Sequence, residues 1–239
     1  MLAAFIDEVE WITFPQTKDG VIYPGFSARS HFHLAAYSDR LFTEAEIPFN
    51  DSLERSVPKR RAEFLAGRCL AKQVLSRLGY EGFVLNCAED RSPRWPENVS
   101  GSLSHSANSV LCAAHIHNNN APACVGVDIE DFMSAKRAES LWPGLVDEEE
   151  YHWLHAQNDE FRCLLTLNFS AKESLFKALY PRIKRYFDFL DARMVTLDSA
   201  KQCFELELLS NLTPEFCAGR RFQGSYLKRA DDITTFLCC

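Results

Sequence analysis

The chain lacks the two features that direct a protein into a membrane. It begins Met1-Leu-Ala-Ala-Phe-Ile-Asp7-Glu8, with no basic region before the apolar residues and two acidic residues directly after them. A secretory signal requires that basic region, and no apolar run approaches the ~20 residues of a transmembrane helix. We therefore expect no direct membrane insertion and a cytoplasmic location.

Positive charge is also scarce. Lysine and arginine total 26 against 33 aspartates and glutamates, which gives a net charge of −7. A general nucleic-acid binder draws its affinity mainly from neutralised phosphates, so no nucleic-acid partner is expected. The 239 residues, 46% of them apolar, are typical of a globular protein of one large domain or two small ones.

Several common motifs are missing. The nine cysteines include no Cys-x-x-Cys pair and are scattered through apolar stretches, which is typical of core residues in a reducing cytosol. A P-loop, Gly-x-Gly-x-x-Gly and Gly-x-Ser-x-Gly are absent, which argues against the common NTPase, dinucleotide and hydrolase classes. Three close histidine pairs lack further ligands at a known spacing, so no metal site is assigned to them: His31 and His33, His115 and His117, and His152 and His155.

Hydrophobic periodicity predicts the order β, α, β-hairpin, α, β. Helices are expected over 58–78, ended by Gly79, over 147–156, and from about 160 to 180, ended by Pro181. The first fifty residues are interpreted as β structure, with a strand at 31–37. Further strands are expected at 110–116, 124–129, 203–209, 221–227 and 234–238. The strands 110–116 and 124–129 are predicted to form the hairpin, connected through 117–122.

The most informative pattern combines three carboxylates with a lysine. Asp128 and Glu130 are two residues apart in a predicted strand, so they share one face. Glu173 and Lys177 are four apart in a predicted helix, so they are stacked neighbours. Magnesium keeps a few carboxylate ligands and takes phosphate oxygens for the rest. The pattern therefore predicts a magnesium ion that holds a pyrophosphate, and a phosphoryl-type transfer.

Each part of this pattern also has a structural interpretation. Asp128 and Glu130 could form the solvated face of an edge strand, and Glu173 with Lys177 could be a surface ion pair. Ser170 and Glu173 also fit a capping box, although helical periodicity already starts at Phe161. Three carboxylates held close together repel one another without a cation, which favours the metal site.

Four motifs follow one another along more than half of the chain. They are Lys59-Arg-Arg-Ala-Glu-Phe-Leu-Ala-Gly-Arg68, Trp95-Pro with Gly101-Ser-Leu-Ser-His105, Gly126-Val-Asp-Ile-Glu130, and Ser170-Ala-Lys-Glu173 with Lys177. In this order they resemble the 4′-phosphopantetheinyl transferases of the larger, surfactin- and enterobactin-synthetase type. The enterobactin-type members, which serve siderophore synthesis, are the ones the chain resembles most.

The resemblance implies an α/β (α+β) fold of two similar halves, residues 1–122 and 123–239. The halves would be related by pseudo-twofold symmetry, with the active site in the cleft between them, so that a monomer suffices. Such an enzyme moves the phosphopantetheine arm of coenzyme A onto a serine of an apo carrier protein and releases adenosine 3′,5′-bisphosphate. The carriers would belong to nonribosomal peptide, polyketide or fatty acid synthases.

The resemblance also assigns the catalytic residues. Asp128, Glu130 and Glu173 match the magnesium ligands around the pyrophosphate, where manganese could replace magnesium. Lys177 matches the lysine that steadies the phosphates and protonates the leaving group, and both Asp128 and Lys177 would contact coenzyme A. The base that takes the serine proton is left open between Glu173 and a metal-bound water.

The nucleotide end of coenzyme A is assigned in the same way. Ser104 and His105 match the pair near the 3′-phosphate, and Arg60 and Arg68 match basic residues that hold the nucleotide phosphates. Alone, the arginines could be helix surface and His105 a structural histidine. The Ser104-His105-Ser106 sequence is, however, expected in a loop before a strand, which favours contact with an anion over a place in the core. The loop around Arg91 and Arg94 has no confident match.

Two other functions stay open at this stage. One is a non-catalytic module that binds coenzyme A or a carrier, and the other is a magnesium-dependent transferase acting on another pyrophosphate substrate. Glu173 and Lys177 favour an enzyme over the first, and the arginines matched to the 3′-phosphate favour coenzyme A over the second. The basic-aromatic segment from Lys184 to Phe187 is a candidate docking surface for the carrier.

Overall fold

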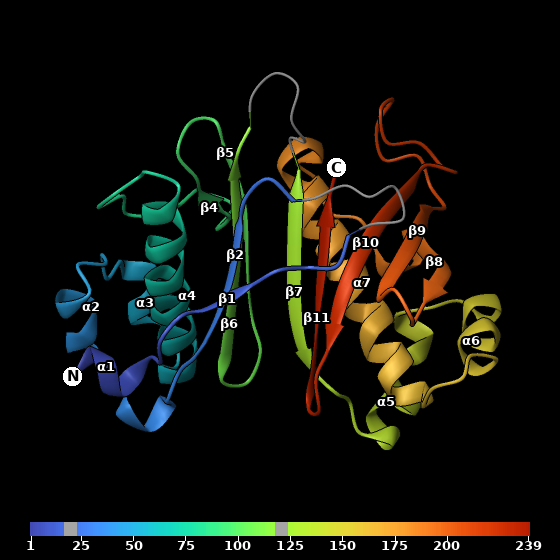
Figure 1. The fold of residues 1–239 in the computed structure, drawn as a ribbon, viewed down its shortest axis with the longest axis horizontal. Coiled ribbons are helices and arrows are strands. Elements are labelled where there is room, and N and C mark those ends of the chain that lie inside the picture. The colour runs from blue at the N-terminus through green and yellow to red at the C-terminus, as the bar shows by residue number, and fades with distance from the viewer. Residues whose placement is uncertain (17–22, 118–123) are drawn as a thin grey trace. The chain divides into compact units, whose positions relative to one another are not determined.

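The computed structural model describes residues 1–16, 23–117 and 124–239. The chain divides into two compact units, the first of residues 1–13 and 24–121 and the second of residues 14–23 and 122–239. The expected boundary between residues 122 and 123 lies outside the described residues, so it stays a prediction. Both units combine helices with an antiparallel sheet (Figure 1), which confirms the α+β class.

The first unit is a four-stranded antiparallel sheet with one long helix against it. The strand order is β1-β2-β6-β5, formed by Glu10–Ile12, Phe26–His31, Ser109–Ile116 and Val99–His105. The long helix α4, Pro58–Arg77, packs on this sheet. The smaller elements are α1 (Leu2–Phe5), η1 (Leu34–Ala36), α2 (Arg40–Glu44), α3 (Asp51–Glu54), β3 (Asn86–Cys87) and β4 (Pro93–Arg94).

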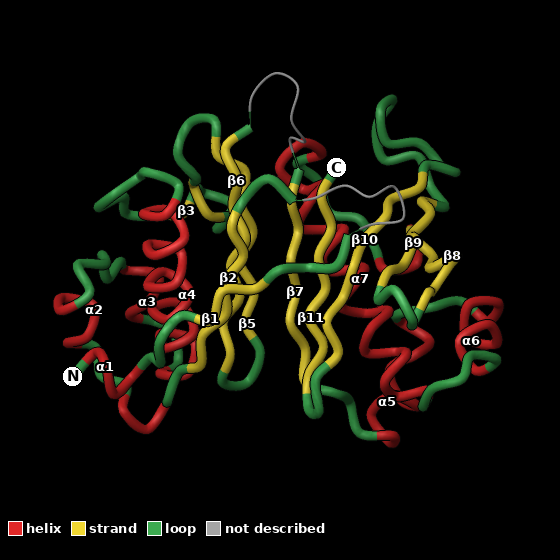
Figure 2. Tube along the Cα trace, viewed as in Figure 1, coloured by secondary structure: helices red, strands yellow, loops and turns green. Residues whose placement is uncertain are grey.

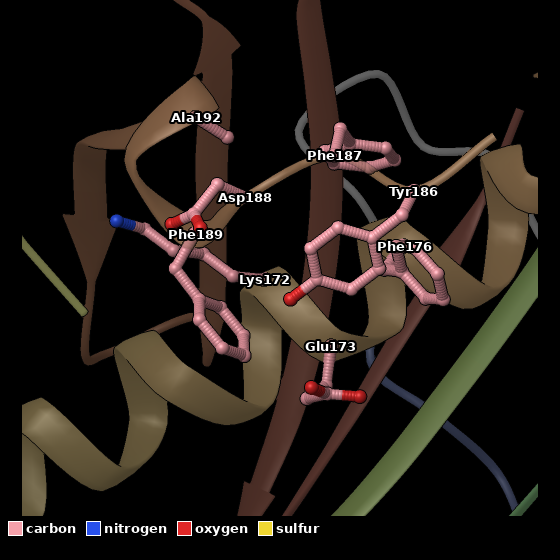
Figure 3. Close-up of a pocket in the computed structure, with 8 residues that line it drawn as sticks. All are labelled: Lys172, Glu173, Phe176, Tyr186, Phe187, Asp188, Phe189 and Ala192. Carbon is pink, nitrogen blue, oxygen red and sulfur yellow. The ribbon is translucent and has the colours of Figure 1, made fainter. Parts of the chain in front are cut away.

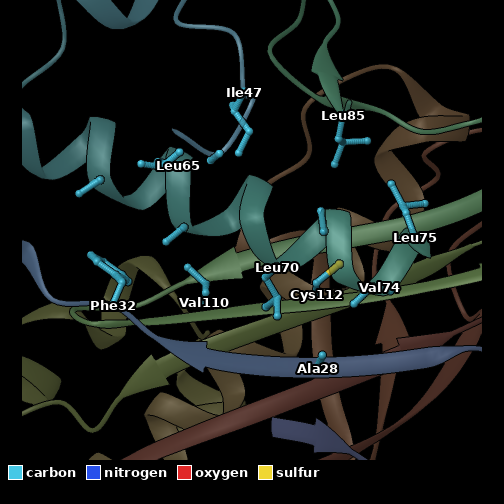
Figure 4. Packing of buried hydrophobic residues seen from close by; sticks show 14 of the residues in the cluster. Ala28, Phe32, Ile47, Leu65, Leu70, Val74, Leu75, Leu85, Val110 and Cys112 are labelled. Carbon is cyan, nitrogen blue, oxygen red and sulfur yellow. The ribbon is translucent and has the colours of Figure 1, made fainter. Parts of the chain in front are cut away.

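Helix α4 follows the prediction closely. Pro58 occupies its first turn, where the missing N–H costs nothing, and Gly79 follows its end with a φ of +92°. Its buried face includes Leu70, Val74 and Leu75, and Figure 4 shows Leu70 and Val74 next to Cys112 of the sheet, in the same core as Ala28 and Val110. This core fixes the helix that carries Arg60 and Arg68.

Two predictions for the first unit are wrong. The expected strand 31–37 ends at His31, because the chain turns into the short helix η1. Ser104 and His105 were expected in a loop, but they end strand β5, where Ser104 is buried. Gly101 of the same strand has no side chain because the Trp95 ring covers it, at 2.5 Å from where a Cβ would lie.

The expected hairpin of residues 110–116 and 124–129 is also wrong. Strand β6 pairs with β2 and β5, whereas β7 (Val125–Asp131) pairs with β11 in the other sheet. The hairpin partner of β6 is β5, through a tight turn in which the Ser106 N–H donates to the Ser109 carbonyl at 3.0 Å. Most of the predicted connection 117–122 lies outside the described residues.

The second unit is a five-stranded antiparallel sheet in the order β7-β11-β10-β9-β8 (Figure 2). Its predicted strands are confirmed, as β9 (Cys203–Leu208), β10 (Arg221–Lys228) and β11 (Asp232–Cys238). The other elements are β8 (Ala192–Asp198), α5 (Ala135–Leu141), η2 (Trp142–Gly144), α6 (Glu148–His155), α7 (Phe161–Ile183) and η3 (Phe189–Asp191). Strand β8 and helix α5 were not predicted.

Helix α7 runs one turn past its predicted end. Pro181 lies in its last turn, and the helix closes when the Lys184 N–H donates to the Tyr180 carbonyl at 2.8 Å. The start at Phe161 rules out a capping box at Ser170, whose buried hydroxyl instead contacts the Thr235 hydroxyl at 2.9 Å. Within the described residues, no helix is long and apolar enough to cross a membrane.

The cysteines of the described residues are all free thiols. Four are buried as expected of core residues, namely Cys112, Cys124, Cys163 and Cys203, whereas Cys217 is exposed and the others are half-buried. The terminal doublet has a structural role, because Cys238 belongs to β11 and the backbone of Cys239 pairs with that of Cys124 at 2.9 and 3.1 Å.

Gly126 brings strand β7 against the backbone of helix α7. A Cβ on this residue would lie 1.8 Å from the Ser174 carbonyl oxygen and 2.8 Å from the Ala178 nitrogen. Any side chain would therefore push the strand and the helix apart. Since β7 carries Asp128 and Glu130 while α7 carries Glu173 and Lys177, this glycine sets the spacing of the predicted site.

We predict that Gly126→Ala lowers the free energy of unfolding by more than ~3 kcal/mol, because overpacking against backbone has no side chain that can yield. Gly144→Ala is the matched control, since a Cβ there meets nothing within 4 Å. Urea unfolding of both variants tests this. Equal stability of the two variants would contradict the close approach of β7 and α7.

Candidate active site

The structure brings the four predicted catalytic residues together in the second unit. Asp128 and Glu130 lie on β7, which packs directly on α7 with its Glu173 and Lys177. The Lys177 ammonium donates to Asp128 Oδ1 at 2.6 Å. The Asp128 side chain is only 3% exposed, so this is a largely desolvated ion pair and not the solvated edge of a strand.

The two glutamates are held in surroundings that disfavour their ionised forms. Burial raises the pKa of Glu130 to about 8, with a further contribution from the charge of Asp128, while Lys177 opposes the shift. Burial also raises the pKa of Glu173, which Lys177 lowers and Asp128 raises. The single ammonium does not balance the three carboxylates, so the cluster favours an additional cation.

The carboxylates alone do not complete a metal site. Among the described residues, no group of three or more histidine, cysteine, aspartate or glutamate side chains is placed to hold a metal ion. The donors nevertheless fit magnesium, which prefers oxygen ligands, keeps few from the protein and takes others from phosphate. The raised pKa values of Glu130 and Glu173 indicate the same need for positive charge.

A buried ion pair behind the cluster was not predicted. The Lys172 ammonium contacts Glu150 Oε2 at 2.7 Å and the Leu145 carbonyl at 2.8 Å, and the two charged side chains are 2% and 1% exposed. Glu150 Oε1 accepts from Asn168 Nδ2 at 2.6 Å and from the Met194 N–H at 2.7 Å. This network fastens α6 and β8 to α7. In the sequence, Glu150 is only one of several acidic residues in the first turn of a predicted helix, so its buried ion pair was not predicted.

A hollow of about 60 Å³ lies beside Glu173 (Figure 3). Four of its eight lining residues are aromatic and three are charged, and the lining comes from α7, the loop that follows it, η3 and the start of β8. Figure 3 shows the rings of Tyr186 and Phe176 next to each other, and their centroids are 5.5 Å apart. An apolar group could therefore rest next to the Glu173 carboxylate.

The predicted nucleotide contacts line one large pocket of the first unit. The pocket has a volume of about 800 Å³, and Arg60, Arg68, Ser104 and His105 all line it. Further polar lining residues were not assigned from the sequence: Asn50, Arg55, Ser56, Glu63, Glu89 and Arg91. Of the two arginines without a confident match, Arg91 lines the pocket and Arg94 is not among its lining residues.

The pocket holds its cationic side chains in fixed positions. Arg60 Nη1 lies 2.7 Å from His105 Nε2, and Glu63 Oε2 lies 3.7 Å from His105 Nδ1. The Arg68 guanidinium stacks on the Phe64 ring at 4.4 Å and donates to Cys87 Sγ at 3.1 Å. Burial lowers the pKa of Arg68, which the Cys87 thiol opposes. Four arginines and a histidine line this pocket, which suits a phosphate group.

Comparison with known proteins gives matches for both units. Residues 49–115 match the 4′-phosphopantetheinyl transferase N-terminal domain, and residues 124–227 match the 4′-phosphopantetheinyl transferase superfamily. The chain is 31% identical over 216 residues to enterobactin synthase component D of Salmonella typhi, covering 88% of this chain and 86% of the relative.

Two further relatives also match large parts of the chain. Enterobactin synthase component D of Salmonella austin is 35% identical over 223 residues, covering 90% of this chain and 88% of the relative. A 4′-phosphopantetheinyl transferase of Nocardia iowensis is 30% identical over 163 residues, covering 66% and 71% of the two chains. The matched segments include each of the residues assigned to the two sites.

We predict that substitutions of two neighbouring residues of α7 differ strongly in their effect on stability. Lys172→Met leaves Glu150 as a buried charge without its cation, so the free energy of unfolding should fall by ~3–5 kcal/mol. Glu173→Gln removes a carboxylate that its surroundings disfavour, and stability should change by less than ~1 kcal/mol. Urea unfolding at pH 7 tests both variants. A similar loss in the two would contradict the different roles assigned to them.

We also predict how the stability of the metal-free protein depends on pH. The folded chain holds the Glu130 proton more tightly than the unfolded chain does, because the pKa rises from 4.5 to about 8. This contribution is fully present below pH 4.5 and is lost as the pH rises to 8, by up to ~1.4 kcal/mol per pH unit. Glu130→Gln should flatten that slope in chelator-treated protein. If stability depends on pH with the same slope in the variant and the wild type, the pKa of Glu130 is not raised.

Proposed function

The chain belongs to the 4′-phosphopantetheinyl transferase family, and we propose that its two sites act on one coenzyme A molecule. The phosphopantetheine arm would pass to a serine of an apo carrier protein. The observation that carries the proposal is the convergence of Asp128, Glu130, Glu173 and Lys177 where β7 packs on α7. The relatives named enterobactin synthase component D support carriers of nonribosomal peptide and siderophore assembly.

The reaction exchanges one phosphorus–oxygen bond for another. The serine oxygen bonds to the phosphorus that bears the pantetheine arm, and the bond from that phosphorus to the bridging oxygen of the pyrophosphate breaks. Adenosine 3′,5′-bisphosphate leaves with the bridging oxygen. Catalysis of such a transfer consists mainly of placement and charge neutralisation, which is what buried carboxylates and a lysine can organise.

We assign the proton acceptor to Glu173. Burial raises its pKa, and a carboxylate with a raised pKa is a stronger base at neutral pH. Asp128, Glu130 and one oxygen of Glu173 would hold the magnesium or manganese ion, whose charge, when bound, neutralises the pyrophosphate. The second oxygen of Glu173 keeps lone pairs for the serine proton.

Lys177 would stabilise the leaving group. Its ammonium lies on Asp128 in the metal-free chain, one helical turn from Glu173. A lysine side chain is flexible and carries three donors, so it can turn from Asp128 to the phosphate oxygens. There it would neutralise the departing bisphosphate and donate a proton to it.

The pocket of the first unit would hold the nucleotide. Arg60, Ser104 and His105 would contact the 3′-phosphate, and Glu63 would keep the imidazole in position, as its contact with His105 suggests. Arg68, supported by Phe64, would add a second guanidinium. The proposal therefore requires that residues of both units bind one coenzyme A molecule.

The two rival functions have less support. A non-catalytic binding module would not need Glu173 and Lys177 beside two further acids, yet all four are in place. A transferase for another pyrophosphate substrate would not need cationic side chains dedicated to a 3′-phosphate. The pocket with Arg60, Arg68 and His105 favours coenzyme A.

We expect an apo peptidyl carrier domain to gain one phosphopantetheine arm, seen by intact mass, when it is incubated with the protein, coenzyme A and magnesium. Glu173→Ala and Lys177→Ala should each slow the transfer at least ~100-fold, because each removes a group that acts on the reacting atoms. Chelation of the metal should stop it. No mass gain with several carriers, although coenzyme A binds, would favour the non-catalytic module.

Dephospho-coenzyme A tests the assignment of the 3′-phosphate contacts. The wild type should prefer coenzyme A by at least ~10-fold in kcat/KM, since charged hydrogen bonds contribute about 1.5–3 kcal/mol each. Arg60→Ala should reduce this preference by lowering activity toward coenzyme A alone. Arg40→Ala, an exposed arginine of α2 outside the pocket, is the control. Equal use of both substrates by the wild type would contradict the assignment.

A further inference from the structure

The loop after helix α7 presents an aromatic ring to solvent between charged residues. Tyr186 is 69% exposed, which is unusual for a large aromatic side chain. Lys184 and Arg185 precede it and are exposed, and Leu190, four residues after it, is 44% exposed. We call these four residues the rim. Aromatic and arginine side chains are enriched at protein interfaces and among the residues that contribute most to binding.

The rim is held in a defined conformation. Lys184 closes α7 in the left-handed region with a φ of 53°. The Asp188 N–H donates to Asp191 Oδ2 at 2.7 Å, and the Leu190 N–H donates to Asp188 Oδ1 at 3.2 Å, which forms a capping box for η3. Arg185 donates to the Asn211 carbonyl at 3.0 Å. A preorganised loop loses little entropy when a partner binds.

The rim borders the hollow beside Glu173. Tyr186 lines the hollow together with Phe176 and Phe187, whose ring centroids are 5.2 Å apart. Both Tyr186 and Glu173 line the hollow, so a group that enters it would lie next to both side chains. An apolar side chain that enters here comes within reach of the proposed base.

The charge of the rim differs from that of the whole chain. The chain has a net charge of −7, but the segment from Arg182 to Arg185 contains three cations in four residues. Arg182 is paired with Glu215 at 2.6 Å, whereas the acceptor of Arg185 is a neutral carbonyl. The rim is therefore a cationic border around an apolar ring, and it complements an acidic surface with an apolar centre.

Our inference rests on the proposed function. A serine on a folded protein reaches a phosphate near Glu173 only if the surface around that serine lies against the residues around Glu173. We propose that the rim is the docking surface of the carrier protein. An apolar side chain of a carrier helix next to the serine occupies the hollow under Tyr186, and acidic residues of that helix face Lys184 and Arg185.

Direct binding tests the proposal without turnover. The probe is a fluorescently labelled apo peptidyl carrier domain whose modifiable serine is replaced by alanine, and anisotropy gives its Kd. Tyr186→Ala should raise the Kd about 10- to 100-fold, as expected for the loss of an anchoring aromatic side chain. The double variant Lys184→Glu, Arg185→Glu should raise it to a similar extent, because two attractive charges become repulsive. The charge-reversal effect should shrink at high salt, which screens exposed charges.

The control is Lys201→Glu, the charge reversal of a lysine that is 70% exposed and lies between β8 and β9 of the same unit. It should leave the carrier Kd unchanged. The rim variants should also bind coenzyme A with wild-type affinity, because no rim residue is among those that line the nucleotide pocket.

Two results would overturn the proposal. Carrier affinity that is unchanged in both rim variants would exclude the rim as the docking surface. Weakened coenzyme A binding by Tyr186→Ala, with normal carrier binding, would assign the hollow to the pantetheine arm instead. Failure of the proposed function is distinguishable, because then the wild type would bind the carrier through the rim but transfer no phosphopantetheine to an unmodified carrier.

Discussion

The close approach of β7 to α7 at Gly126 is the constraint on which the second unit depends. With no side chain at this position, the strand lies against the helix backbone near Ser174 and Ala178. The same contact places Asp128 under Lys177 and brings Glu130 near Glu173. A wider spacing would let water in, lower the pKa values of the carboxyl groups and weaken the need for a cation. Packing and chemistry are thus linked by one glycine.

Helix α7 separates structural from chemical residues by its periodicity. Lys172 points into a buried network with Glu150, and Ser170 and Ser174 contact Thr235 of the sheet. Glu173 and Lys177 lie on a partly exposed side of the same helix. Because these buried contacts hold the helix in place, the reactive side chains can stay in an electrostatically unfavourable cluster without loosening the fold. The buried contacts of α7 thus offset the electrostatic repulsion within the site.

Sequence patterns predicted what depends on local periodicity and failed where partners are distant. Helix α4, most of α7 and strands β9 to β11 follow apolar repeats and helix-ending signals, and the spacing of Asp128 with Glu130 predicted a shared face. Strand β7 pairs with β11, about a hundred residues further along the chain. The prediction instead paired β7 with β6, the strand next to it in the sequence, and was wrong. Glu150 was missed because its partners Lys172 and Met194 come from other elements. Arg55 and Glu63 became site candidates only once the pocket was visible.

The central claim is that the carboxylates of β7 and α7 bind a divalent cation together with a pyrophosphate, and not alone. The most direct test is manganese binding, followed by electron paramagnetic resonance, with no ligand, with coenzyme A, and with adenosine 3′,5′-bisphosphate, which lacks the pyrophosphate. We predict that coenzyme A tightens manganese binding at least ~10-fold and that the bisphosphate does not. Replacement of Asp128 by asparagine should remove the effect. Equally tight binding in all three conditions, or in the Asp128→Asn variant, would contradict the account.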